Sequence, residues 1–225
     1  MHKIIQILLI NMFATISYAQ ENLNFQYIFK KDTDSYREII DKNWDQSKNV
    51  TMILKADIGS AHYLWFFEKE NKVDVKGGAG ELSTIKYHNL KANLMLEDHT
   101  GLIQIARFQD FGNEVYTPEF QYPYCLADDA DKDGKPEFYL TYLGASDGLD
   151  EKPLKVIIYS ASNLNHDKYT KSKATAWYPG GNENDVYHVE YDANWNKLPI
   201  AIQERGLKIL NDIRVQNVLV AGQTN

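Results

Sequence analysis

The chain has 225 residues, with 24 Lys and Arg against 31 Asp and Glu, a formal net charge of −7 and a single cysteine. These numbers exclude a disulfide-stapled mini-protein, which needs paired cysteines, and argue against a nucleic-acid-binding surface, which needs clustered Lys and Arg. Hydrophobic residues make up 44% and aromatic residues 12% of the chain, which argues against disorder and leaves a globular protein with a packed core.

The N-terminus has the order of parts typical of a secretory signal peptide. A positive start at His2 and Lys3 precedes a largely apolar stretch, and residues 17–19 place small side chains at the −3 and −1 positions of a cleavage site. The apolar stretch is shorter than the ~20 residues that a membrane-spanning helix needs. We therefore expect residues 1–19 to be a signal peptide. The mature chain is expected to be exported to the periplasm or the cell surface and to contain no transmembrane segment.

Short runs rich in Val, Ile, Tyr, Phe and Trp, separated by Gly, Asn and Asp, predict strands along the mature chain. The predicted strands are residues 50–56, 62–70, 85–87, 92–96, 102–108, 137–143, 154–160, 173–177 and 186–191. Two segments favour helices. Residues 34–44 follow an Asp- and Thr-rich start, and residues 200–213 place apolar side chains on one face after Pro199, although Gly206 is unfavourable inside a helix.

This pattern predicts a mainly β fold. We expect antiparallel sheets, arranged as a sandwich or an open barrel, with a short N-terminal helix and a C-terminal helix, and a mixed α+β fold is the alternative. Residues 20–225 are expected to form one domain. A possible seam lies at residues 110–123, where Gly112 and Pro118 interrupt the strand pattern.

The strongest chemical signal is an acidic loop after residue 128. Its expected metal ligands are the carboxylates of Asp129, Asp131, Asp133 and Glu137 and the main-chain carbonyl of Lys135. Ca²⁺ takes six to eight oxygen ligands, and a tight loop with acids at alternate positions can supply them. Gly134, at the sixth position, permits the sharp turn that such a loop needs. We predict a structural Ca²⁺ ion here, and a solvated Asp-rich turn without metal is the alternative.

The loop is not an EF-hand, because the twelfth position, which should hold a bidentate Glu, is Leu140. It resembles the calcium loop of integrin-type and FG-GAP repeats, in which the ninth-position acid closes the site and a strand follows directly. A weaker version of the pattern at residues 192–197, in which Asn194 and Asn196 follow Asp192, lacks the glycine. We interpret it as an Asx-rich turn before the C-terminal helix.

Two patterns of catalytic type are interpreted as structural. Residues 144–148 match G-x-S-x-G around Ser146, but a nucleophile elbow requires a helix directly afterwards, and here a predicted strand follows. His188, Glu190 and Asp192 alternate along a predicted strand, which would place them on one face. Such alternation is also the ordinary pattern of a half-exposed antiparallel strand.

The run from Leu126 to Tyr142, which contains the acidic loop, is followed by Ser146-Asp147 and by Leu154-Lys155 with an apolar strand. This order resembles a family of exported bacterial proteins described as surface polysaccharide biosynthesis proteins. The resemblance implies a link to lipopolysaccharide or capsule production and implies no defined reaction. The chain departs from many members at Ala145, where they carry a cysteine.

Together these features predict an exported, non-catalytic cell-envelope protein with a calcium loop, which supports the biosynthesis or binding of surface polysaccharide. Its expected partners are surface glycans or envelope assembly proteins. One alternative is a secreted glycan-active hydrolase that uses paired carboxylates such as Glu190 and Asp192. The second alternative is a purely structural partner subunit, which would have an exposed apolar patch.

Overall fold

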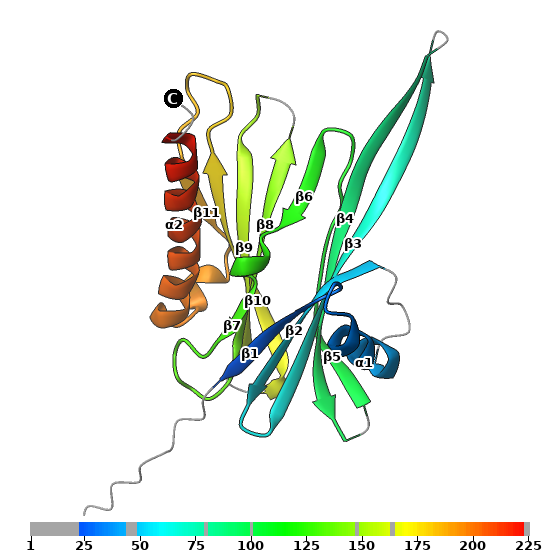
Figure 1. Cartoon of the computed structure of the whole chain (residues 1–225). Helices are drawn as coiled ribbons and strands as arrows, with labels where there is room; N and C mark the ends of the chain where they lie inside the picture. Colours follow the sequence, from blue (N-terminus) through cyan, green and yellow to red (C-terminus); the bar gives the residue numbers. More distant parts are fainter. Residues whose placement is uncertain are drawn as a thin grey trace, which may run out of the picture.

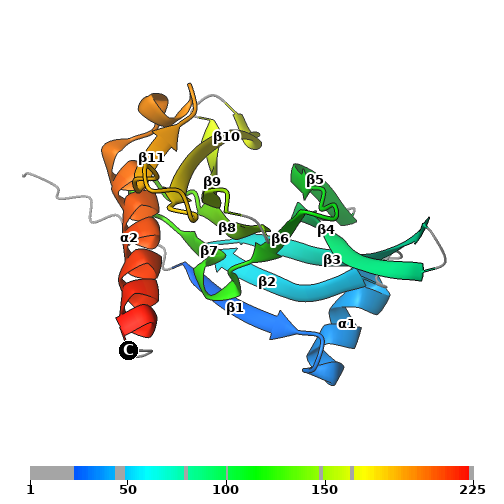
Figure 2. The same cartoon turned by 90° about the horizontal axis from the view of Figure 1, so that it is seen from above.

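Two antiparallel β-sheets form the body of the molecule, and one helix lies on the outer side of each sheet (Figures 1 and 2). The computed structural model describes residues 23–43, 49–78, 81–99, 101–146, 149–162 and 165–222. The expected signal peptide at residues 1–19 lies outside the described residues, as does Trp44 at the end of the first predicted helix.

The first sheet is a simple meander in which each strand pairs with the next. It contains β1 (Asn24–Phe29), β2 (Val50–Ile58), β3 (Ala61–Gly78), β4 (Glu81–Asp98) and β5 (Gly101–Asp110). Helix α1 (Thr33–Asn43) connects β1 to β2. Strands β3 and β4 pair with each other from Tyr63 and Leu96 to Gly78 and Glu81, and they extend beyond their neighbours as a two-stranded arm (Figure 1, upper right).

The second sheet has the strand order β11-β10-β9-β8-β6, and β7 pairs with the first part of β8. Its strands are β6 (Tyr116–Phe120), β7 (Leu126–Asp128), β8 (Glu137–Ser146), β9 (Lys152–Ser162), β10 (Asn165–Tyr178) and β11 (His188–Tyr191). A short 3₁₀ helix, η2 (Tyr122–Tyr124), lies between β6 and β7, and a second, η3 (Trp195–Lys197), precedes the C-terminal helix α2 (Ile200–Gly222).

Alternating side chains of the facing strands build a shared core between the sheets. Trp65 of β3 packs against Phe138 of β8 and Tyr159 of β9, with ring centroids 5.5 and 6.1 Å apart. The neighbouring residues of β8 and β9 point to the opposite face, where Tyr139 and Ile158 pack with α2. Because successive residues of a strand point to opposite faces, both sides of β8 and β9 are apolar.

Helix α2 approaches the second sheet closely at one glycine. A Cβ atom at Gly206 would lie 2.8 Å from the Trp195 ring and 3.0 Å from Cδ1 of Ile158, and both of these side chains are buried. The glycine that is unfavourable for a helix interior is therefore required by packing.

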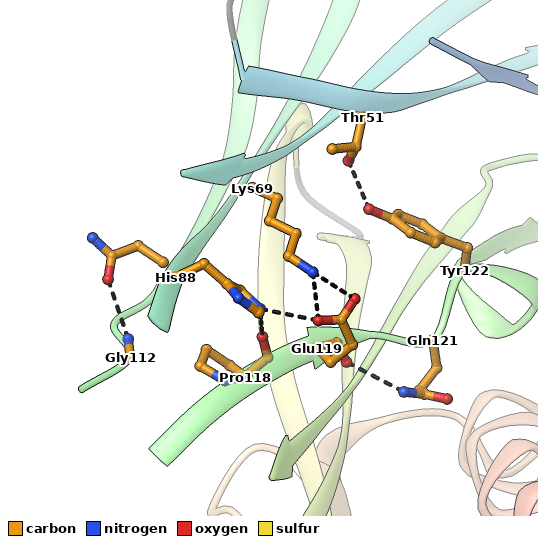
Figure 3. A network of polar contacts seen from close by, with 9 residues as sticks. Thr51, Lys69, His88, Gly112, Pro118, Glu119, Gln121 and Tyr122 are labelled. Carbon is orange, nitrogen blue, oxygen red and sulfur yellow. Dashed lines mark hydrogen bonds and ion pairs between the residues drawn. The ribbon is translucent and has the colours of Figure 1, made fainter. Parts of the chain in front are cut away.

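A polar network joins the two sheets at the base of the arm (Figure 3). Nε2 of the buried His88 of β4 donates to the carbonyl of Pro118 in β6 and lies 3.0 Å from Oε2 of Glu119. Lys69 of β3 donates to both carboxylate oxygens of Glu119, at 2.7 and 2.9 Å. Burial lowers the pKa of His88, and the charge of Lys69 adds to this effect. The lowered pKa favours the neutral imidazole, which fixes β6 against β4.

The prediction of a mainly β fold with a C-terminal helix is confirmed, and the sheets do not close into a barrel. The separate strands predicted at 85–87 and 92–96 are wrong, since both belong to β4. Three strands, β1, β6 and β7, were not predicted. The segment 110–123 is where the chain crosses from the first sheet to the second.

Among the described residues, no helix is both long enough and apolar enough to cross a membrane.

Replacing Gly206 with Ala should destabilise the fold although alanine is the better helix former. Overpacking against Trp195 and Ile158 costs about 1–3 kcal/mol, while the gain in helix propensity is at most about 1 kcal/mol. We expect the free energy of unfolding in urea to fall by about 1–2 kcal/mol. Asn211→Ala, at an exposed position of the same helix, should leave it unchanged or raise it slightly. A Gly206→Ala variant as stable as wild type would contradict the close packing.

The contribution of His88 to the free energy of unfolding should fall as the pH falls below 6.5, the ordinary pKa of histidine. The folded protein holds His88 at a lower pKa than the unfolded chain does, so the unfolded chain takes up the proton first and gains stability as the pH falls. We expect His88→Gln to have a smaller pH slope between pH 7 and 5, measured by urea unfolding, than His99→Gln, which alters an exposed histidine. Equal slopes would contradict this role of His88.

Candidate metal centre

The acidic loop lies between β7 and β8, and the pairing of these strands fixes both of its ends. Asp128, the last residue of β7, is opposite Glu137, the first residue of β8. Oδ2 of Asp128 also forms an ion pair with Arg205 of α2, whose Nε lies 2.6 Å away. The loop is therefore anchored to the sheet and to the C-terminal helix.

The backbone of the loop turns through two residues with positive φ, Lys132 at 60° and Gly134 at 83°. This conformation suits glycine and costs a residue with a side chain roughly 1 kcal/mol. The turn directs the main-chain N–H of Gly134 to Oδ2 of Asp129 at 3.2 Å, and the N–H of Ala130 donates to Oε2 of Glu137 at 2.9 Å. These hydrogen bonds orient the two carboxylates that begin and end the loop.

Three of the predicted ligands come together. Carboxylate oxygens of Asp129, Asp131 and Glu137 lie within 4.8 Å of one another, which is close enough for one metal ion to bind all three. Oδ1 of Asp129 and Oδ1 of Asp131 are buried and have no hydrogen-bond partner. Because a buried oxygen without a partner is costly, this arrangement is suited to a cation.

The other two predicted ligands, Asp133 and Lys135, lie in the same loop. Oδ1 of Asp133 accepts a hydrogen bond from the main-chain N–H of Lys135 at 2.9 Å, and its Oδ2 lies 3.8 Å from the ammonium group of Lys135. Asp133 thus has its own cationic partner. Leu140, at the EF-hand glutamate position, is fully buried in the core between the sheets, which agrees with the interpretation that this is not an EF-hand.

Burial and crowding of like charges disfavour the ionised form of the clustered acids. Burial is the main cause that raises the pKa of Glu137 to about 8, and the carboxylates of Asp131 and Asp129 add to it. The pKa values of Asp129 and Asp131 are also raised, first by burial and then by the charge of Asp133. A bound cation would reverse this effect by favouring the ionised carboxylates.

A cavity of about 210 Å³ adjoins the cluster, and Asp131, Asp133 and Glu137 form one side of it. Its other polar lining residues are Ser160, Thr170, Ser172, Asn194 and Lys197. The sequence analysis did not identify these five residues. They come from β9, β10, and the turn around η3, and no local motif connects them.

The Asx-rich segment at residues 192–197 forms a turn, as predicted. Oδ1 of Asp192 accepts hydrogen bonds from the main-chain N–H groups of Asn194 and Trp195, at 3.1 and 3.0 Å. Glu190 is exposed and accepts a hydrogen bond from Nε1 of Trp177. His188 is exposed as well and lies 3.7 Å from a carboxylate oxygen of Glu151. The alternating row is therefore a solvated strand face in which each acid already has a partner.

Two residues whose side chains could act as nucleophiles, Ser146 and Cys125, lie in surroundings that do not activate them. Ser146 ends β8, and the next element along the chain is strand β9 rather than the helix that a nucleophile elbow requires. Cys125 is fully buried, which raises the pKa of its thiol to about 12. A thiol with so high a pKa is a poor nucleophile.

Comparisons of the chain with protein-family models, with curated proteins and with solved structures found no match.

With metal removed by a chelator, the contribution of Glu137 to the free energy of unfolding should fall as the pH rises from 4.5 towards 8. In this window folded Glu137 keeps a proton that the unfolded chain has already lost, so deprotonation favours unfolding. Glu137→Gln should remove the part of the pH slope that Glu137 contributes and so make the slope smaller. At pH 8 its free energy of unfolding should exceed that of wild type by at least about 1 kcal/mol.

Urea unfolding between pH 5 and pH 8.5 in the presence of EDTA measures this effect. Glu190→Gln is the matched control, because Glu190 is exposed, and its pH slope should equal that of wild type. A Glu137→Gln variant with an unchanged slope would contradict the charge balance described for the loop.

Proposed function

We propose that this chain is an exported, non-catalytic cell-envelope protein whose acidic loop binds a structural Ca²⁺ ion, and that it supports the biosynthesis or binding of surface polysaccharide. The observation that carries the proposal is the cluster of Asp129, Asp131 and Glu137, whose oxygens lie within 4.8 Å of one another. Two buried oxygens of the cluster have no hydrogen-bond partner. A bound cation would give these two oxygens the polar partner that they lack.

The donor chemistry favours Ca²⁺ over other biological metals. The clustered ligands are all carboxylate oxygens, which suit hard cations, whereas zinc and copper sites draw on histidine or cysteine. Mg²⁺ requires nearly ideal octahedral geometry and gives up its water reluctantly. Ca²⁺ accepts irregular sets of six to eight oxygens, so main-chain carbonyls and water can complete its coordination here.

The position of the loop supports a structural role for the ion. The loop joins two paired strands, and Asp128 at its start is ion-paired with Arg205 of α2. A cation at Asp129, Asp131 and Glu137 would hold the start of β8 to the loop beside this helix contact. In an exported protein whose one cysteine has no disulfide partner, a calcium site supplies a local cross-link.

The envelope location and the link to polysaccharide rest on the signal-type N-terminus and on the family resemblance of the segment around the acidic loop. The hydrolase alternative would need Glu190 and Asp192 to face a common pocket. Asp192 caps a turn and Glu190 is exposed beside Trp177, so these two carboxylates do not form the pair that the alternative requires.

Calcium should bind the mature protein and stabilise it. Extracellular calcium sites have dissociation constants of about 10⁻⁴ to 10⁻³ M, and a ligand present at 100 times its dissociation constant adds about 2.7 kcal/mol of stability. For a chain of this size we expect the midpoint of thermal unfolding to rise by roughly 5–10 °C in saturating Ca²⁺. Isothermal titration calorimetry with CaCl₂ gives the affinity and stoichiometry directly.

Asp131→Asn should weaken Ca²⁺ binding at least tenfold, because it removes one negative ligand of the cluster. Asp192→Asn is the matched control: it neutralises an acid of the other Asx turn and leaves an oxygen that can accept the same main-chain hydrogen bonds. The proposal fails if wild type shows no calcium-dependent heat or shift in melting temperature, or if Asp131→Asn binds as tightly as Asp192→Asn.

A further inference from the structure

The cavity beside the acidic loop is lined by groups that the calcium loop itself does not need. Thr170 of β10 is directly opposite Ser160 of β9, and Ser172 lies two residues further along β10. Since residues two apart on a strand share a face, these three hydroxyl side chains lie on the same side of the sheet. Asn194 and Lys197, from the turn before α2, complete the polar lining.

Ser172 provides the observation that points to a ligand. Its side chain is 0% exposed, it lines the cavity, and its Oγ has no hydrogen-bond partner. Leaving a buried hydroxyl unpaired costs free energy, and an apolar residue would fit between Ile158 and Ala174 of the adjoining core at no such cost. A hydroxyl at this position is explained if a bound molecule supplies the missing partner.

The charges around the cavity indicate the class of that molecule. Lys197 donates to Oδ1 of Asn194 at 3.0 Å, and within the described part of the chain no carboxylate is in ion-pair contact with its ammonium group. On the other side, Asp131 and Glu137 of the acid cluster line the cavity, and so does Asp133, which is paired with Lys135. A Ca²⁺ ion held there would face the same space as Lys197, so two cations would favour one carboxylate ligand.

The size of the cavity limits the ligand to one small unit. Its volume of about 210 Å³ is below that of pockets for drug-sized molecules, which are roughly 300–1,000 Å³. Three hydroxyl side chains and one amide in so small a space suit a ligand that itself carries several hydroxyl groups.

We propose that this cavity binds a single hydroxylated carboxylate with the chemistry of a hexuronate unit. The ligand carboxylate completes the coordination of the Ca²⁺ ion and pairs with Lys197, and the ligand hydroxyls exchange hydrogen bonds with Ser172, Thr170 and Asn194. This inference rests on the proposed calcium site. It adds a ligand class to that site and involves no bond-making step.

The test is calorimetric titration of the mature, calcium-loaded protein with sodium D-glucuronate. Matched probes are D-glucose, which lacks the carboxylate, and acetate, which lacks the hydroxyl groups. We expect glucuronate to bind at least tenfold more tightly than either probe, and its binding to disappear in EDTA. Methyl β-D-glucuronide distinguishes the source of the ligand: tighter binding than the free acid indicates the end of a glycan, and weaker binding indicates a free uronic acid.

Two variants separate the ligand from the metal. Lys197→Met should weaken glucuronate binding roughly tenfold or more, and Ser172→Ala roughly two- to tenfold, since these are the ranges for losing a charged and a neutral hydrogen bond. Both should keep the Ca²⁺ affinity of wild type within twofold. Lys173→Met is the control, because Lys173 neighbours Ser172 on β10 and therefore points to the opposite face.

The outcomes distinguish this inference from the proposed function. If Ca²⁺ binds and glucuronate does not, or if glucuronate binds equally well in EDTA, the inference is wrong and the calcium site stands. If Ca²⁺ itself does not bind, the proposed function is wrong, and the inference that rests on it is wrong too. A loss of glucuronate binding in Lys173→Met equal to that in Lys197→Met would also overturn the inference, because it would place the ligand elsewhere.

Discussion

The second sheet is buried on both faces at its central strands, β8 and β9, and the position of the acidic loop depends on this. Its inner face packs against the first sheet through Trp65, Phe138 and Tyr159, and its outer face packs against α2 through Tyr139 and Ile158. Strands enclosed in this way cannot shift register, because a shift by one residue would exchange the two buried faces. The start of β8 is therefore a fixed point from which the acidic loop extends. Among the residues that the structure describes, neither the first sheet nor α1 contributes to the acid cluster or to the adjoining cavity, and this sheet acts as the support for the sheet that does.

On this rigid support the protein holds an arrangement that is unfavourable by itself. Carboxylates are brought close together, Glu137 is almost fully buried at 2% exposure, and Lys132 adopts a left-handed conformation. Such features persist only where the surrounding structure determines them, and they are concentrated at binding sites. Burial that raises the pKa values of the acids also leaves their oxygens short of partners, and a divalent cation relieves both effects together. The electrostatic cost and the capacity to bind a metal thus have the same physical origin.

Sequence patterns identified most strands because antiparallel strands carry their signal locally, as alternation and as turn residues. The failures have specific causes. Strand β6 contains Pro118, which interrupts a strand pattern but is tolerated because β6 lies at the edge of its sheet. Strand β4 was divided because His88 and Asn89 break its apolar run. Both are buried in the fold and hydrogen-bonded to the segment that leads into β6, through the carbonyl of Pro118 and the N–H of Gly112. These partners are more than 20 residues away, so the pattern within β4 could not indicate them.

The sequence by itself determined the acidic loop, since its acids and its glycine lie within nine residues and their spacing sets the conformation that brings oxygens together. It also determined that the fold is mainly β, because period-two alternation is a property of each strand. Only the tertiary structure decided which acids meet, namely Asp129, Asp131 and Glu137, while Asp133 pairs with Lys135. Only the tertiary structure placed Ser172 and Lys197 beside them. That proximity follows from the register of β9 with β10 and from the packing of α2 on the sheet, and these long-range contacts leave no trace in local spacing.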